Sequence, residues 1–213
     1  MAMRRRRVSR LFLESALLVA SILLAFALNR WWEASQDRLL ADRALSTFAQ
    51  EIIENRDNLA RVMPYHEGLH DLFAGLSAAG TIRTFEDVRE LEGFDGFQPA
   101  FLTTTAWHSA LATGAVVHMD YDIVRELSAL YTYQDRYTEY SDFRHLLAPG
   151  ALADANIAAA LFSAEIYLIN VISGARELTA MYDRVLERLG APAGKPAGAP
   201  GVRSGGLLGA PSP

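Results

Sequence analysis

The stretch that decides the fold is LFLESALLVASILLAFAL, residues 11–28. As a helix it spans about 27 Å, at about 1.5 Å per residue, which is close to the hydrocarbon thickness of a bilayer. Glu14 is its one ionisable residue, and it lies one turn from the start, where its side chain can reach the headgroups. We therefore predict a transmembrane helix over residues 11–30.

The charges on either side of this span predict its orientation. The basic segment 1–10 contains Arg4, Arg5, Arg6, Arg7 and Arg10. After the span, two arginines and two acids balance each other between residues 30 and 38. Positive charge favours the cytoplasmic side, and tryptophans such as Trp31 and Trp32 favour the membrane interface. We expect a single-pass protein of the bacterial inner membrane, with a cytoplasmic N-terminus and a periplasmic C-terminal domain. A signal peptide cleaved after Ala25, Phe26 and Ala27 is the alternative.

The remainder of the chain is acidic and contains no cysteine. Residues 30–189 hold 13 arginines and no lysine against 24 acids, a net charge of −11. Such a surface repels phosphate backbones, so we expect no nucleic-acid partner. The lack of cysteine excludes disulfides, thiolate zinc sites and a cysteine nucleophile.

We predict an all-α fold in which the membrane helix continues as a stalk into a helical bundle over residues 31–189. No glycine or proline interrupts residues 29–63. This stretch contains an apolar stripe with coiled-coil spacing, made of Leu45, Phe48, Ile52, Asn55, Leu59 and Val62. It indicates packing against other helices of the chain or, alternatively, a homo-oligomer through the stalk with Asn55 setting register. We expect Pro64 to break or kink this helix and a second one to cover residues 66–79.

Local signals predict the later helices. One short helix is expected around residues 85–91 inside a folded loop. Threonines 103–105 are expected to cap a helix that ends at Gly114, and Asp120 to cap the next one, up to about Leu147. A last helix should extend to Leu189, and its apolar half, residues 157–175, is either a bundle helix, as we prefer, or a second span. The Pro- and Gly-rich residues 190–213 are predicted to form a disordered tail.

One motif indicates chemistry. His66, Glu67 and His70 form HEGLH, which matches the pattern in which two histidines on one helix face hold zinc and the glutamate acts as base. Glu90 is the best third ligand by spacing, and Glu86 is next. A membrane-bound zinc-dependent hydrolase is therefore the alternative function. The simpler interpretation places both histidines on an ordinary amphipathic helix, with no cofactor.

The anchor region also resembles a known family. The span and the helix after it follow the pattern E-x-x-L, ILLA, N-x-W-x-E and E-I-x-x-N, on Glu14, Ile22, Leu23, Leu24, Ala25, Asn29, Trp31, Glu33, Glu51, Ile52 and Asn55. A second patch comprises Thr105, Ala106, Trp107, Thr113, Gly114 and the helix up to Tyr131. Over roughly residues 10–140 the chain is similar to a bacterial family of uncharacterised single-pass membrane proteins, a domain of unknown function. The resemblance implies an anchor and a helical domain, without a site.

Together these patterns favour a non-enzymatic, membrane-anchored helical module with an interaction or structural role in the bacterial envelope. Its expected partners are the lipid bilayer and either a second copy bound through the stalk helix or another envelope protein.

Overall fold

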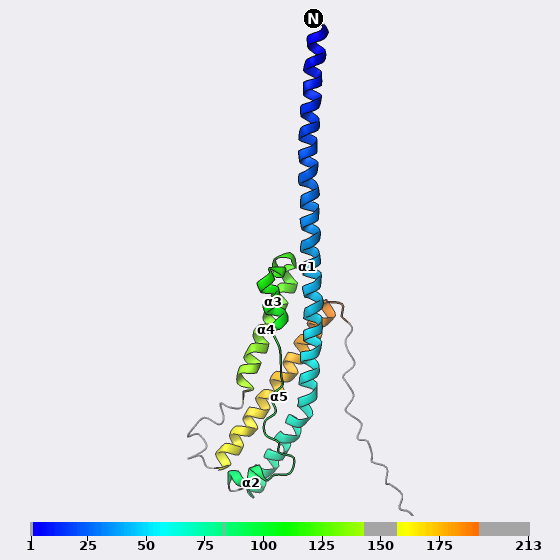
Figure 1. Cartoon of the computed structure of the whole chain (residues 1–213). Helices are drawn as coiled ribbons and strands as arrows, with labels where there is room; N and C mark the ends of the chain where they lie inside the picture. Colours follow the sequence, from blue (N-terminus) through cyan, green and yellow to red (C-terminus); the bar gives the residue numbers. More distant parts are fainter. Residues whose placement is uncertain (1, 83, 143–156, 192–213) are drawn as a thin grey trace, which may run out of the picture. The chain divides into compact units, whose positions relative to one another are not determined.

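A computed structural model describes residues 2–82, 84–142 and 157–191. Its elements are α1 (Ala2–Ala79), α2 (Phe85–Arg89), α3 (Thr105–Thr113), the 3₁₀ helix η1 (Ala115–His118), α4 (Tyr121–Tyr140) and α5 (Ile157–Arg188) (Figure 1). Within these ranges there is no strand, which confirms the all-α prediction. The predicted tail from residue 192 onward, and the start of the last helix before residue 157, lie outside the described residues.

Helix α1 passes through Pro64 without a break. The prediction of a separate helix over residues 66–79 is therefore wrong. Proline removes one N–H and frees the carbonyl of Ala60, but both residues are exposed, so water can solvate that carbonyl. Leu59 and Leu69 on either side are buried, which holds both halves of the helix in place. Figure 1 shows α1 changing direction in its turquoise stretch.

The chain divides into two compact units. The first, Met1–Glu51 with Thr104–Ala129, contains the N-terminal part of α1, α3, η1 and the start of α4. Its core contains Phe48, whose ring centroid lies 6.2 Å from that of Trp107. Four alanines of this unit are also buried, and their small side chains let the helices approach closely: Ala41, Ala106, Ala110 and Ala115.

The ends of α3 show which local signals decided its bounds. Gly114 ends the helix with a left-handed φ of 73°, as predicted. At the start, however, the Thr104 side chain makes no capping bond. The carboxylate of Glu51 instead accepts the Ala106 N–H at 2.9 Å, which places a negative charge at the positive end of the helix. The prediction of a threonine cap is thus wrong, because the Glu51 carboxylate of α1 caps the helix instead.

Asp120 caps α4 as predicted, since its carboxylate accepts the N–H groups of Asp122 and Ile123 at 2.9 and 3.2 Å. The helix ends at Tyr140, earlier than the expected Leu147.

The second unit, Ile52–Thr103 with Leu130–Pro213, contains the C-terminal part of α1, α2, the second half of α4 and α5. Here α5 lies antiparallel to α1, because residues further along α1 bond to residues that come earlier in α5. Arg56 bonds Asp183 at 3.0 Å, Arg176 bonds Glu67 at 2.7 Å, and Ser77 bonds Glu165. One face of α5 is buried, including Leu168, Val171, Ala175, Leu178 and Tyr182.

The segment between α2 and α3 is a folded loop, as predicted. Phe94 and Phe97 pack against Phe73, with ring centroids 5.7 and 6.2 Å away. Phe97 also contacts Tyr167 of α5, at 5.1 Å. The loop therefore belongs to the core of the second unit.

Two helices, α1 from Glu14 onward and α5, are long and apolar enough to cross a membrane. They differ in burial: none of the apolar window of α1 is buried, whereas 33% of the α5 window is.

Candidate functional site

The HEGLH segment lies on α1 within the second unit, and its first histidine points into the core. His66 is 1% exposed, and its Nε2 lies 2.8 Å from the backbone oxygen of Gln98. Since a carbonyl only accepts, Nε2 carries the proton and Nδ1 is the unprotonated nitrogen. Nδ1 has no hydrogen-bond partner. Burial lowers the pKa of His66 below 6.5, against a smaller opposing effect of the Gln98 bond, so the ring is neutral at neutral pH.

The other members of the motif have polar partners. The carboxylate of Glu67 accepts a hydrogen bond from Arg176 at 2.7 Å. His70 Nδ1 lies 3.2 Å from Asp71 Oδ1. Glu90 is the exposed C-cap residue of α2, and Glu86 is in its first turn. Among the residues that the structure describes, no group of three histidines or acids is arranged to hold a metal ion.

Glu67, His70 and Asp71 line one side of an open groove of about 410 Å³. Ile169, Ile172, Ser173 and Arg176 of α5 line the other side. The groove is therefore lined by a mixture of charged, polar and apolar side chains, as is common in the contact surfaces of proteins.

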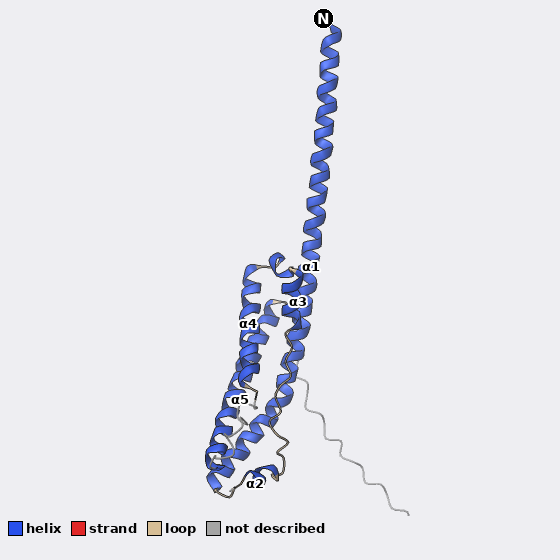
Figure 2. Cartoon of the chain, turned by 60° about the vertical axis from the view of Figure 1, so that its left-hand side comes forward, coloured by secondary structure: helices blue, strands red, loops and turns tan. Residues whose placement is uncertain are grey.

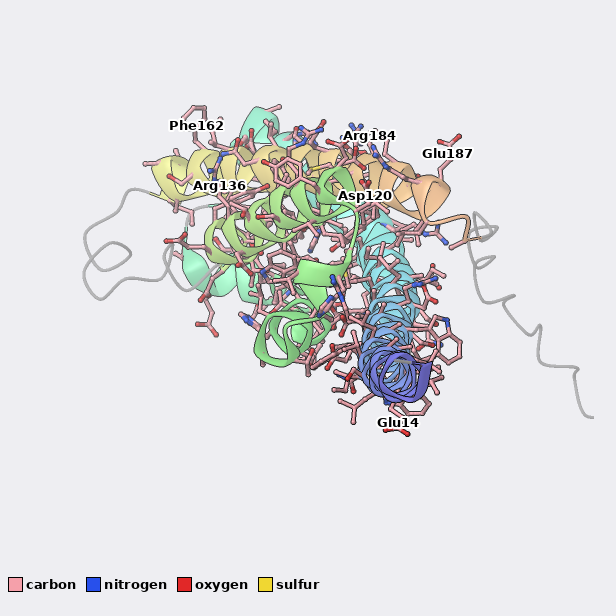
Figure 3. The ribbon with its side chains drawn as sticks, turned by 90° about the horizontal axis from the view of Figure 1, so that it is seen from above. Glu14, Asp120, Arg136, Phe162, Arg184 and Glu187 are labelled. Carbon is pink, nitrogen blue, oxygen red and sulfur yellow. The ribbon has the colours of Figure 1, made fainter. Side chains whose placement is uncertain are left out.

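An exposed apolar face of α5 adjoins this groove. Phe162, Ile166 and Ile169 recur at helical spacing and are 63%, 43% and 45% exposed. Figure 3 shows Phe162 projecting outward from α5. We call these three residues the α5 face. Singly exposed apolar residues are ordinary, but a contiguous row marks a surface suited to contact.

A polar cluster lies inside the second unit, centred on Asn55. Its amide donates to the Thr103 oxygen at 2.8 Å and to Gln134 Oε1 at 3.2 Å, and its Oδ1 accepts the Thr103 N–H at 2.9 Å. Gln134 also donates to the Thr103 oxygen, and Tyr182 donates to Gln134. Asn55 and Gln134 are 1% exposed and Tyr182 is fully buried. The cluster is a structural network that joins α1, α4 and α5.

This network decides how the α1 stripe is used. Phe48, Ile52, Asn55 and Leu59 are all buried within the chain. The stripe therefore packs against the chain's own helices, which was the first of our two interpretations.

The tyrosines of α4 also serve the core. Tyr131 and Tyr137 are buried, and the Tyr137 and Tyr140 rings meet edge-on at 5.3 Å. Burial raises the pKa of Tyr137 and of Tyr140, so both phenols stay protonated. Gly174 of α5 faces them, and a Cβ there would meet the Tyr140 hydroxyl and lie 3.1 Å from the Tyr137 ring. A side chain at position 174 would therefore require the Tyr140 ring to move.

Comparison with protein-family models, curated proteins and solved structures finds no match for this chain. The resemblance to the single-pass family thus stays a prediction.

Proposed function

We propose that this protein is a membrane-anchored helical module with an interaction or structural role in the bacterial envelope. In this proposal α1 crosses the inner membrane over residues 11–30, residues 1–10 are cytoplasmic, and the remaining helices lie in the periplasm. It is a function of position and contact, without chemistry of its own.

The observation that carries the proposal is the bare apolar surface of α1. Large apolar side chains are 47–64% exposed at Leu17, Leu18, Val19, Ile22, Leu23, Leu24, Phe26 and Leu28. Each would gain about 1.5–3 kcal/mol from full burial. Nothing in the described part of the chain covers them, since none of this window is buried. A bilayer is the cover that suits an 18-residue helical run followed at once by Trp31 and Trp32.

The α5 face supports the interaction role. It presents Phe162, Ile166 and Ile169 beside a groove that charged and apolar side chains line together, which is the mixture expected of a contact surface. A second copy joined through the α1 stripe would have to displace contacts already made within the chain. An envelope protein bound at the α5 face is therefore the partner that we favour.

The hydrolase alternative has less support. Its base, Glu67, is engaged by Arg176, and among the described residues no group of three histidines or acids is arranged to hold a metal ion.

The test is membrane extraction of the tagged full-length chain combined with its intact mass. We expect the protein to stay in the membrane pellet after a carbonate wash, at a mass that includes residues 1–30. A soluble periplasmic product that begins near residue 28 would instead establish a cleaved signal peptide. As a control, Leu23→Arg with Leu24→Arg adds about 5–7 kcal/mol to insertion and should abolish membrane retention.

A further inference from the structure

A second apolar surface lies in the first unit, where α3 passes through η1 into α4. Val117 is 75% exposed, Tyr121 is 79% exposed and Leu111 is 48% exposed. We call these three residues the α3–α4 corner. They come from the end of α3, from η1 and from the first residue of α4, so the patch belongs to one turn of the chain.

Contacts within the first unit determine where this corner lies along α1. The start of α3 lies at Phe48 and Glu51, through Trp107 and the Ala106 N–H. Past its end, His118 Nδ1 lies 3.5 Å from Asp37 Oδ2. Thus α3 runs antiparallel to α1, and its C-terminal end points toward the tryptophans. In Figures 1 and 2 the turn between α3 and α4 lies beside α1, at the end of this helix pair that is nearer the N-terminus.

The distance to the membrane interface follows from helix geometry. Asp37 comes five residues after Trp32, which is about 7.5 Å along the helix axis. Both tryptophans are exposed, at 65% and 59%, as suits side chains at headgroup level. Transmembrane helices also tilt by about 20° on average, and a tilt toward α3 lowers the corner further. The corner is thus within side-chain reach of the headgroups.

We propose that the α3–α4 corner rests on the periplasmic surface of the same bilayer that α1 crosses, with Val117 and Tyr121 among the headgroups. The inference rests on the proposed membrane anchor. A lipid surface is the occupant because α1 holds the corner beside it permanently, whereas a protein partner would have to enter that space. Tyrosine suits this position because one end of its side chain is apolar and the other is polar.

The charges at the corner are compatible with lipid. Asp120 is occupied by the N–H groups of Asp122 and Ile123. Asp122 is paired with Arg125 at 3.6 Å, and Asp37 lies beside His118. These acids therefore have local partners that reduce their repulsion from anionic headgroups. A second contact with the bilayer fixes the rotation of the first unit about the axis of α1.

The cysteine-free chain allows a direct test. Single cysteines replace Val117 or Tyr121 in the full-length protein and carry an environment-sensitive fluorophore. The protein is placed in vesicles of phosphatidylethanolamine and phosphatidylglycerol that contain a lipid with a nitroxide either on its headgroup or, in a parallel sample, in its acyl chain. The matched control is Gln50→Cys, which is exposed in the same unit and about 20 Å further along α1 than Asp37. Leu24→Cys tests the anchor.

We expect quenching at positions 117 and 121 to be about twofold or more stronger than at position 50, because the interface lies within reach only of the corner. If position 24 is quenched by a nitroxide in the acyl chain while 117 and 121 match 50, the inference is wrong and the anchor stands. If position 24 is not quenched, both fail. A blue-shifted, unquenched signal at 117 that persists in detergent identifies a protein contact and also overturns the inference.

Discussion

Replacement of Asn55 by alanine should destabilise the second unit far more than the same change at Asn58, one turn further along α1. The Asn55 amide is 1% exposed and satisfies both the N–H and the oxygen of Thr103. Asn58 is only half-buried and donates one bond, to the Phe101 oxygen at 2.9 Å. The two residues thus form a matched pair in one helix.

The magnitude follows from which groups lose their partners. After Asn55→Ala the Thr103 oxygen still accepts from Gln134, but the Thr103 N–H is orphaned, at a cost of about 1–3 kcal/mol. The other lost bonds add about 1 kcal/mol, for a total of about 2–4 kcal/mol. Asn58→Ala should cost about 1 kcal/mol or less, because water replaces its bond.

Thermal unfolding of the full chain in mild detergent, followed by circular dichroism, measures the difference. For a chain of this size, 2–4 kcal/mol corresponds to a fall in Tm of roughly 4–16 °C. Equal shifts in the two variants would refute the role assigned to the polar cluster.

Three further predictions concern the second unit. Burial lowers the pKa of His66 in the folded chain. Below about pH 6.5 the unfolded chain therefore binds a proton at this histidine that the folded chain does not bind. The free energy of unfolding should thus be unaffected above that pH and fall below it. Between pH 7 and 5.5 the Tm of the wild type should therefore fall more than that of His66→Gln, and parallel curves would contradict this. Arg56→Ala should lower the free energy of urea unfolding by about 1.5–3 kcal/mol, because the Arg56 side chain is 9% exposed and bonds Asp183. Arg176→Ala should lower it by less than about 1 kcal/mol, because the Arg176 side chain is 66% exposed. The reverse order would be inconsistent with the packing of α1 on α5. Purified protein should contain no stoichiometric zinc, with His66→Ala plus His70→Ala as control; one zinc per chain that the double variant lacks would restore the hydrolase alternative.

Local signals predicted the features that depend on neighbours in sequence. Gly114 ends α3 because glycine adopts the left-handed conformation without strain. Asp120 caps α4 because its carboxylate needs to reach only two or three residues ahead. The loop with Phe94 and Phe97 was predicted to be folded because aromatic residues seldom stay in solvent. For Gly114 and Asp120 the decisive interaction spans a few residues, whereas the aromatic partners of the loop, Phe73 and Tyr167, are distant in sequence.

Features that depend on distant partners were not predictable in the same way. The α3 cap comes from Glu51, 55 residues before Ala106, and no pattern in the sequence near α3 predicts it. Continuity at Pro64 depends on tertiary packing on both sides of the proline. For HEGLH, the spacing placed the residues on one helix, but the partners of His66 and Glu67 are Gln98 and Arg176, which only the folded chain brings near. Asn55 was noticed as polar in an apolar stripe, yet its partners were unknown.

Cysteine accessibility in spheroplasts tests our proposal that α1 crosses the membrane with the folded helices outside the cytoplasm. Single variants Gln50→Cys and Ser9→Cys of the cysteine-free chain are treated with a membrane-impermeant maleimide. If α1 spans the membrane in this orientation, position 50 is labelled in intact spheroplasts and position 9 only after lysis. Protection of position 50, or labelling of position 9 before lysis, would contradict it.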